Sequence, residues 1–292
     1  MTGATTRALP DTGFLVLALG LVGLYGPLAP ELARDWSRSG DFSHGWVVAP
    51  ATAWMLWQRR DALRSAPVGT WAPGGILLGL AIVQYLLGAA ASEFWLLRTS
   101  IVPWSIGCVG LMWGRERARL CVFPLAFLLF MIPPPSLVWN TVALPLQLLA
   151  SRAAETALAV GGVEVLRTGN VLQLDGVALE VAQACSGLRS LVALLALGAV
   201  LAEGSLVGGG PRSAAFRWAV FLSAIPVAVA ANALRVAATA LAAARLGDAA
   251  VTGRAHEIAG LAMFVVSFGL LWLGRSGLGC IERRVSASSP RS

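Results

Sequence analysis

Apolar segments of membrane-span length recur along almost the whole chain, and they limit its possible folds more than any other feature. They lie at about residues 14–30, 45–58, 74–91, 95–113, 120–132, 187–202, 215–235 and 257–273. Only 13% of the 292 residues are charged, whereas a soluble domain carries about 25%. Because a span needs about 20 mostly apolar residues, the sequence predicts an α-helical polytopic membrane protein with about eight transmembrane helices.

The domain organisation follows from this pattern. Leu15–Leu28 has neither a strongly basic region before it nor a clear cleavage site, so we interpret it as part of the first span rather than a signal peptide. We expect one membrane-embedded domain over residues 1–275 and a short cytoplasmic tail over residues 276–292. The sequence contains no apparent internal repeat.

The region between the fifth and sixth spans, about residues 133–184, is predicted to be an extracytoplasmic insertion. Three consecutive prolines, Pro133 to Pro135, end the preceding helix. Residues 137–160 are interrupted by polar side chains, which favours an interfacial or partly re-entrant helix. Within it, Arg152 and Glu155 are spaced as neighbours on a helix surface.

Residues 163–182 change to the alternation typical of strands. Thr168-Gly169-Asn170 indicates a turn, and Asp175-Gly176 is a strong signal for a two-residue hairpin. We expect two or three short strands, and we place this β-hairpin region outside the bilayer because open sheet edges are not tolerated in lipid.

The arginine distribution predicts the orientation. All 22 basic residues are Arg, and they lie between the apolar runs as topology signals do. Eight spans with cytoplasmic termini put 13 of the 22 on the cytoplasmic side. In this orientation Cys185, Arg235, His256 and His44 all reach the outer face of the membrane.

Cys185 is the candidate nucleophile. The sequence places it just before a helix whose first residues are Ser186 and Gly187, and the positive potential of a helix N-terminus favours thiolate over thiol. Arg189, four residues on, is expected to share a helix face with Cys185. Position alone gives equal weight to a second interpretation, in which Cys185 is a small apolar residue buried between helices.

Two other polar positions are expected at the same outer level. His256 opens the last span and accepts a proton near neutrality, so it would pair with a cysteine nucleophile; alternatively, it only hydrogen-bonds a loop. Arg235 and Asn232 are three residues apart in a membrane helix, where an arginine is costly and by default indicates function. They would donate to a developing oxyanion, although snorkelling to the interface would also explain Arg235.

His44, at the start of the second span, is a second candidate for positioning substrate or for the base. Glu93 and Arg98 are expected to form a structural ion pair. Four dispersed cysteines and two histidines argue against a metal site, and no cofactor is indicated.

These residues together resemble the exosortase/archaeosortase family. The resemblance rests on Ala184-Cys185-Ser186-Gly187-Leu188-Arg189-Ser190, on Ala231-Asn232-Ala233-Leu234-Arg235, and on His256-Glu257-Ile258-Ala259-Gly260. Phe42-Ser43-His44-Gly45 and Phe130-Met131-Ile132-Pro133 are similar too, and the resemblance covers roughly residues 40–275.

The resemblance implies a transpeptidase-like cysteine protease of the bacterial inner membrane. Its partners would be exported proteins with a C-terminal sorting signal: a short motif such as Pro-Glu-Pro, a transmembrane helix and a basic tail. The family's Cys, Arg and His match Cys185, Arg235 and His256. Cleavage would occur at the outer face by acyl transfer to an unidentified acceptor nucleophile. The alternatives are a transporter or flippase component and a non-catalytic factor of surface polysaccharide export.

Overall fold

The computed structural model describes residues 11–38, 40–174, 177–181, 186–204, 213–246 and 254–288, with side chains except at 11–12, 177–179, 246, 254–257 and 283–288. The chain divides into two compact units, residues 1–135 and 136–292. The division falls at the end of the proline run. The expectation of one domain over residues 1–275 stays a prediction.

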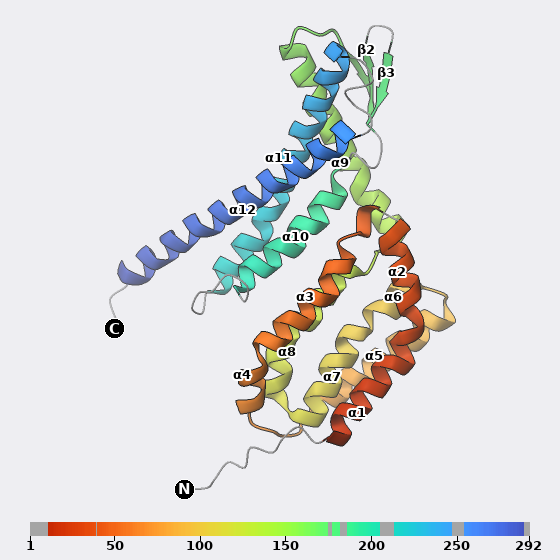
Figure 1. Ribbon diagram of the computed structural model, residues 1–292, viewed down its shortest axis with the longest axis vertical. Helices are drawn as coiled ribbons and strands as arrows, with labels where there is room; N and C mark the ends of the chain where they lie inside the picture. Colours follow the sequence, from red (N-terminus) through yellow and green to blue (C-terminus); the bar gives the residue numbers. More distant parts are fainter. Residues whose placement is uncertain are drawn as a thin grey trace. The chain divides into compact units, whose positions relative to one another are not determined.

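The first unit is entirely helical in its described part (Figure 1). Its elements are α1 (Asp11–Gly20), η1 (Leu21–Tyr25), η2 (Gly26–Leu28), α2 (Ala29–Arg38), η3 (Gly40–Phe42), α3 (Gly45–Gln58), α4 (Arg60–Ser65), α5 (Ala72–Ala90), α6 (Phe94–Thr99), α7 (Ile101–Trp113), α8 (Arg115–Phe127) and η4 (Leu128–Met131). Glycines bring α5 and α7 together: a Cβ on Gly74 would lie 2.8 Å from the Leu111 nitrogen, and one on Gly107 would lie 2.7 Å from the Leu78 nitrogen. Small residues at such contacts are typical of membrane helices.

The second unit is built around one long helix, α11 (Ala214–Leu246). α9 (Ser136–Val160), α10 (Leu188–Glu203) and α12 (Arg254–Ser288) all pack against it, and Figure 1 shows α10 and α12 beside it. Its N-terminal part, including Val220 and Ala228, forms a buried cluster with Leu194 of α10 and Leu271 of α12. Its C-terminal part packs in a second cluster against α9 and the sheet.

All eight apolar segments are helical, but not all are long enough to cross a bilayer alone. Five candidate spans satisfy length and apolarity: Gly13–Arg38, Ala72–Ala90, Phe94–Trp113, Ala214–Arg245 and Ile258–Glu282. A sixth arises if Arg115–Met131 and Ser136–Val160, on the two sides of the proline run, count as one broken span. α3 and α10 have only 14 and 16 residues. The described helices therefore confirm a multi-pass membrane protein but not the number eight.

The sheet is a three-stranded antiparallel meander in the order β1 (Leu166–Thr168), β2 (Val171–Leu174), β3 (Val177–Glu180). Leu174 faces Val177, which confirms the hairpin expected there, although Asp175 and Gly176 themselves lie outside the described residues. Leu172 is 1% exposed in the cluster formed with α9 and α11. The sheet is therefore seated on two long helices.

Two charged residues take other partners than their neighbours in sequence. Glu155 of α9, although spaced as a neighbour of Arg152, pairs with Arg167 of β1 at 2.6 Å, which ties the helix to the sheet. The expected Glu93–Arg98 ion pair is not formed. Arg98, only 8% exposed, pairs with Asp35 at 2.7 Å and Glu31 at 3.4 Å. Glu93 instead accepts a hydrogen bond from the Trp95 backbone at the start of α6. In both cases a partner distant in sequence replaces the local one.

Candidate active site

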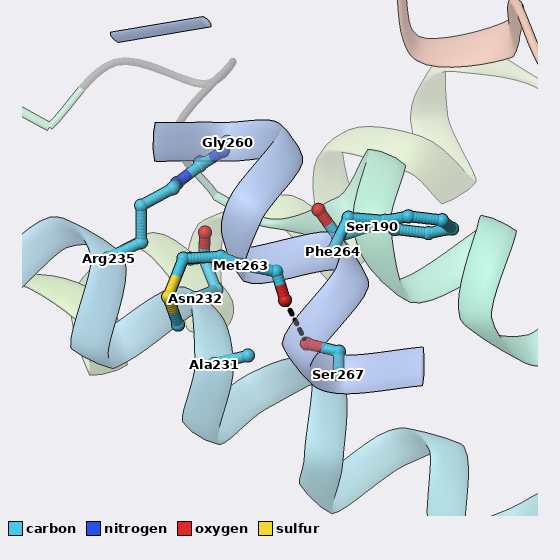
Figure 2. A pocket seen from close by; sticks show the side chains of 8 residues that line it. All are labelled: Ser190, Ala231, Asn232, Arg235, Gly260, Met263, Phe264 and Ser267. Atoms are coloured by element: carbon cyan, nitrogen blue, oxygen red, sulfur yellow. Dashed lines mark hydrogen bonds between the residues drawn. The ribbon is translucent and has the colours of Figure 1, made fainter. Parts of the chain in front are cut away.

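The second unit contains a small recess where three helices meet. It holds about 230 Å³ of empty space, part of it open to the surroundings, and its lining residues are Ser190 of α10, Ala231, Asn232 and Arg235 of α11, and Gly260, Met263, Phe264 and Ser267 of α12. Figure 2 shows these side chains around the recess. Each of the three sequence motifs that carry the candidate catalytic residues contributes to the lining.

The first and second motifs touch through Gly187. This residue has a φ of +80° and lies immediately before α10. A Cβ at this position would overlap the Asn232 side chain, with Nδ2 at 2.7 Å. Glycine is therefore required here twice, for its left-handed backbone and for the close approach of Asn232, which is 7% exposed.

The second and third motifs touch through Arg235. Figure 2 shows Arg235 extending from α11 toward α12, and a Cβ on Gly260 would lie 3.8 Å from its Nη1. Its Nη2 is buried and has no hydrogen-bond partner among the described residues. Burying part of a guanidinium without a partner is costly, so an acceptor for this donor is expected in the rest of the chain or in a bound molecule.

Two of the three proposed catalytic side chains cannot be placed. Cys185 lies outside the described residues. His256 is in the first turn of α12, one helical turn before Gly260, but its side chain is not described. The backbone of the His256 motif therefore borders the recess, whereas the Cys185 motif reaches it through Gly187 and Ser190.

The start of α10 differs from the sequence prediction. The helix begins at Leu188, after Ser186 and the left-handed Gly187. Ser186 and Gly187 are therefore not its first residues, and helical spacing does not extend from Arg189 back to position 185. Ser186 is buried, and its Oγ accepts a hydrogen bond from the Leu188 nitrogen at 3.3 Å. Arg189 is exposed in the first turn. Ser186 therefore fixes the backbone that leads into α10.

His44 belongs to the first unit, where it hydrogen-bonds a backbone carbonyl that the proline run leaves without a helical N–H partner. In a regular helix the carbonyls of Leu129, Phe130 and Met131 would accept from residues 133–135, but prolines have no N–H. The Ile132 nitrogen donates to Leu129 at 3.2 Å. His44 Nε2 hydrogen-bonds the Phe130 carbonyl at 2.9 Å.

The third carbonyl, that of Met131, accepts from Trp36 Nε1 at 2.8 Å. A Cβ on Gly45 would overlap the Trp36 indole, so Gly45 makes room for this contact. The two upstream motifs are thus in contact. His44 hydrogen-bonds the Phe130 carbonyl, and Gly45 makes room for the Trp36 side chain that hydrogen-bonds the Met131 carbonyl. Burial lowers the pKa of His44, an effect that the Phe130 and Asp41 carbonyls partly oppose.

Sequence reasoning missed the contacts of Gly187, Gly260 and Trp36. The signal for the first two was their place inside the motifs, one before an apolar run and one after a histidine. Trp36 had no signal in the sequence, because its partner lies 95 residues away. Among the described residues, no group of three or more His, Cys, Asp or Glu side chains is arranged to hold a metal ion.

Comparison with known proteins gives one family. The family model described as transmembrane exosortase (Exosortase_EpsH) matches residues 36–273. No curated protein and no solved structure matches the chain significantly. The matched range contains all three motifs around the recess and both upstream motifs.

Proposed function

Because the chain belongs to the transmembrane exosortase family, it is a membrane protein-sorting enzyme, and we propose that it cleaves C-terminal sorting signals with Cys185 as nucleophile. Its substrates would be exported proteins that end in a short motif such as Pro-Glu-Pro, a transmembrane helix and a basic tail. The observation that carries this proposal is the convergence of the three motifs on one recess, which Arg235 lines with a buried donor that has no partner among the described residues.

The proposed reaction is acyl transfer. The Cys185 thiolate forms a C–S bond to the scissile carbonyl carbon, and the carbonyl oxygen becomes an oxyanion. Arg235 Nη2 donates to that oxyanion, and the tetrahedral intermediate then expels the amine, which His256 protonates. The thioester is resolved by an amine of the acceptor, or by water, that gives its proton back to His256.

Asn232 is proposed as a positioning residue. It lies one turn from Arg235 on α11, and its side chain packs against Gly187. Its proposed role is to keep the backbone next to Cys185 at a fixed distance from Arg235. Arg189 and Ser186 are proposed to support the same segment, Ser186 through its contact with the Leu188 nitrogen. His44 would support the first unit rather than act as the base, because its Nε2 is engaged by Phe130.

The proposed location is the bacterial inner membrane, with the recess on the extracytoplasmic face. The arginine distribution supports this orientation through the positive-inside rule. Lipid and exported substrates would be the partners, and the acceptor nucleophile would be a component of a surface anchor.

The test is processing of a reporter that carries such a C-terminal signal, co-expressed in a bacterial host. Cys185→Ala and His256→Ala should abolish processing. Arg235→Ala should lower its rate by about 10²–10³, the usual loss for an oxyanion donor. Immunoblots of precursor and product, at matched enzyme levels in the membrane, measure the effect.

The matched control is Arg217→Ala, which removes an exposed arginine from the same helix and should leave processing within twofold of wild type. Undiminished processing in Cys185→Ala would refute the enzyme proposal. That result would instead favour the alternatives, a transporter or flippase component or a non-catalytic factor of surface polysaccharide export.

A further inference from the structure

The outer edge of β3 has the geometry to receive another strand. In the meander, β2 occupies one side of β3, and no described strand pairs with the other. The Val181 nitrogen donates to the Asn170 carbonyl at 2.9 Å. Since hydrogen-bonded pairs alternate along an antiparallel ladder, Val177, Leu179 and Val181 direct their N–H and C=O groups toward β2.

Ala178 and Glu180 therefore direct their backbone N–H and C=O groups away from β2. These are two donors and two acceptors, spaced two residues apart along an edge with which no described strand pairs. β3 contains no proline, so both donors are present. Such an edge is a template for pairing with another chain.

The sheet is anchored well enough to act as a platform. Its β1 strand is fixed to α9 through the Arg167–Glu155 ion pair, and Leu172 and Val181 are buried against α9 and α11. Asn170 Nδ2 also donates to the Val181 carbonyl at 3.2 Å. A strand added to β3 would thus meet a sheet already fixed to α9 and to α11, the helix that carries Asn232 and Arg235.

We infer that β3 receives the extended segment of the exported substrate that precedes its transmembrane helix, as a fourth strand. This inference rests on the proposed function. Continuity with the candidate site selects the occupant: Val181 is four residues before Cys185, a reach of at most about 14 Å. Main-chain pairing presents a peptide bond in extended form and accepts many side chains, which suits an enzyme that must cleave different proteins.

The first test removes the outward donors. Ala178→Pro and Glu180→Pro delete N–H groups that β2 does not use, so both should lower reporter processing at least tenfold. Glu164→Pro is the matched control, because Glu164 is exposed and precedes β1 outside the strands. It should keep processing within twofold of wild type. Wild-type processing in both edge variants would overturn the inference.

The second test does not depend on catalysis or on tolerance of proline. Glu180→Cys is combined with Cys185→Ala and Cys280→Ser, and the reporter carries single cysteines at successive positions before its transmembrane helix. Disulfide cross-links should form with every second reporter position, since alternate side chains of a strand share a face. A period of three to four, uniform cross-linking or no cross-link would refute strand addition. If Cys185→Ala alone still permits processing, the proposed function fails separately.

Discussion

At the residue scale, the candidate site depends on a glycine as much as on its polar groups. Gly187→Ala would place a Cβ in the Asn232 side chain and force a left-handed backbone on alanine. The backbone penalty is about 1–2 kcal/mol, and overpacking adds about 1–3 kcal/mol. We expect a clear fall in the thermal midpoint of the purified protein in detergent, together with loss of reporter processing.

Gly269→Ala is the control for that substitution, because a Cβ there meets nothing within 4 Å and alanine favours a helix interior. Its midpoint should stay equal or rise. Adding Asn232→Ala to Gly187→Ala should restore part of the lost stability, since it removes the overlap but not the backbone strain. No recovery in the double variant would mean that the Gly187–Asn232 contact does not limit stability.

At the scale of elements, the end of η4, which follows α8, depends on side chains from a distant segment. His44 Nε2 donates to the Phe130 carbonyl both in the neutral Nε2–H tautomer and in the imidazolium, but burial disfavours the charged form and lowers the pKa of the imidazole. The unfolded chain therefore binds a proton more readily than the folded one. Burying His44 in its neutral form therefore costs the folded protein no stability above about pH 6.5. Below that value, the free energy of unfolding falls as the pH approaches the folded-state pKa of His44.

His44→Gln tests this linkage, because an amide can donate to the carbonyl but does not titrate. Between pH 8 and pH 5 the thermal midpoint of the wild type should fall more steeply than that of His44→Gln. His256→Gln, which removes the only other histidine, separates the two contributions. Parallel curves for wild type and His44→Gln would show that His44 does not titrate on unfolding.

Elements were predictable to different degrees for physical reasons. The eight apolar runs located described helices, because a backbone in lipid must satisfy its own hydrogen bonds, whereas residues 137–160, which form α9, were expected only as an interfacial or partly re-entrant helix. The runs did not give the ends: α12 continues through Arg275 to Ser288, since caps rather than apolarity end a helix. Pairings such as Arg98 with Asp35, 63 residues apart, were not predictable, because tertiary partners compete with local ones. The site motifs were found, but the contact of Gly187 with Asn232 required the fold.

At the scale of the whole molecule, the number of spans decides the sidedness of the chain. Eight or six spans put both termini on one face of the membrane, whereas five put them on opposite faces. α11 and α12, with 33 and 35 residues, would each extend about 50 Å and exceed the roughly 30 Å hydrocarbon core. α3 and α10 would reach only about 21–24 Å, so they cross only if tilt is small or the bilayer thins.

The arginine distribution, counted for eight spans, favours the arrangement with both termini cytoplasmic. Three thiols test this: Thr5→Cys near the N-terminus, the exposed native Cys280, and Glu164→Cys before β1. All three are made in a Cys185→Ala background, since Cys185 is itself expected at the outer face, and the first and third also carry Cys280→Ser. An impermeant maleimide added to intact spheroplasts should label only Glu164→Cys, and the other two should react after permeabilisation. Labelling of only one of Thr5→Cys and Cys280 in intact spheroplasts would contradict an even number, because the termini would then lie on opposite faces, whereas labelling of both would contradict the cytoplasmic location of the termini. Since the sheet and the recess belong to the same unit, the side on which Glu164→Cys reacts also decides from which side substrate must approach β3.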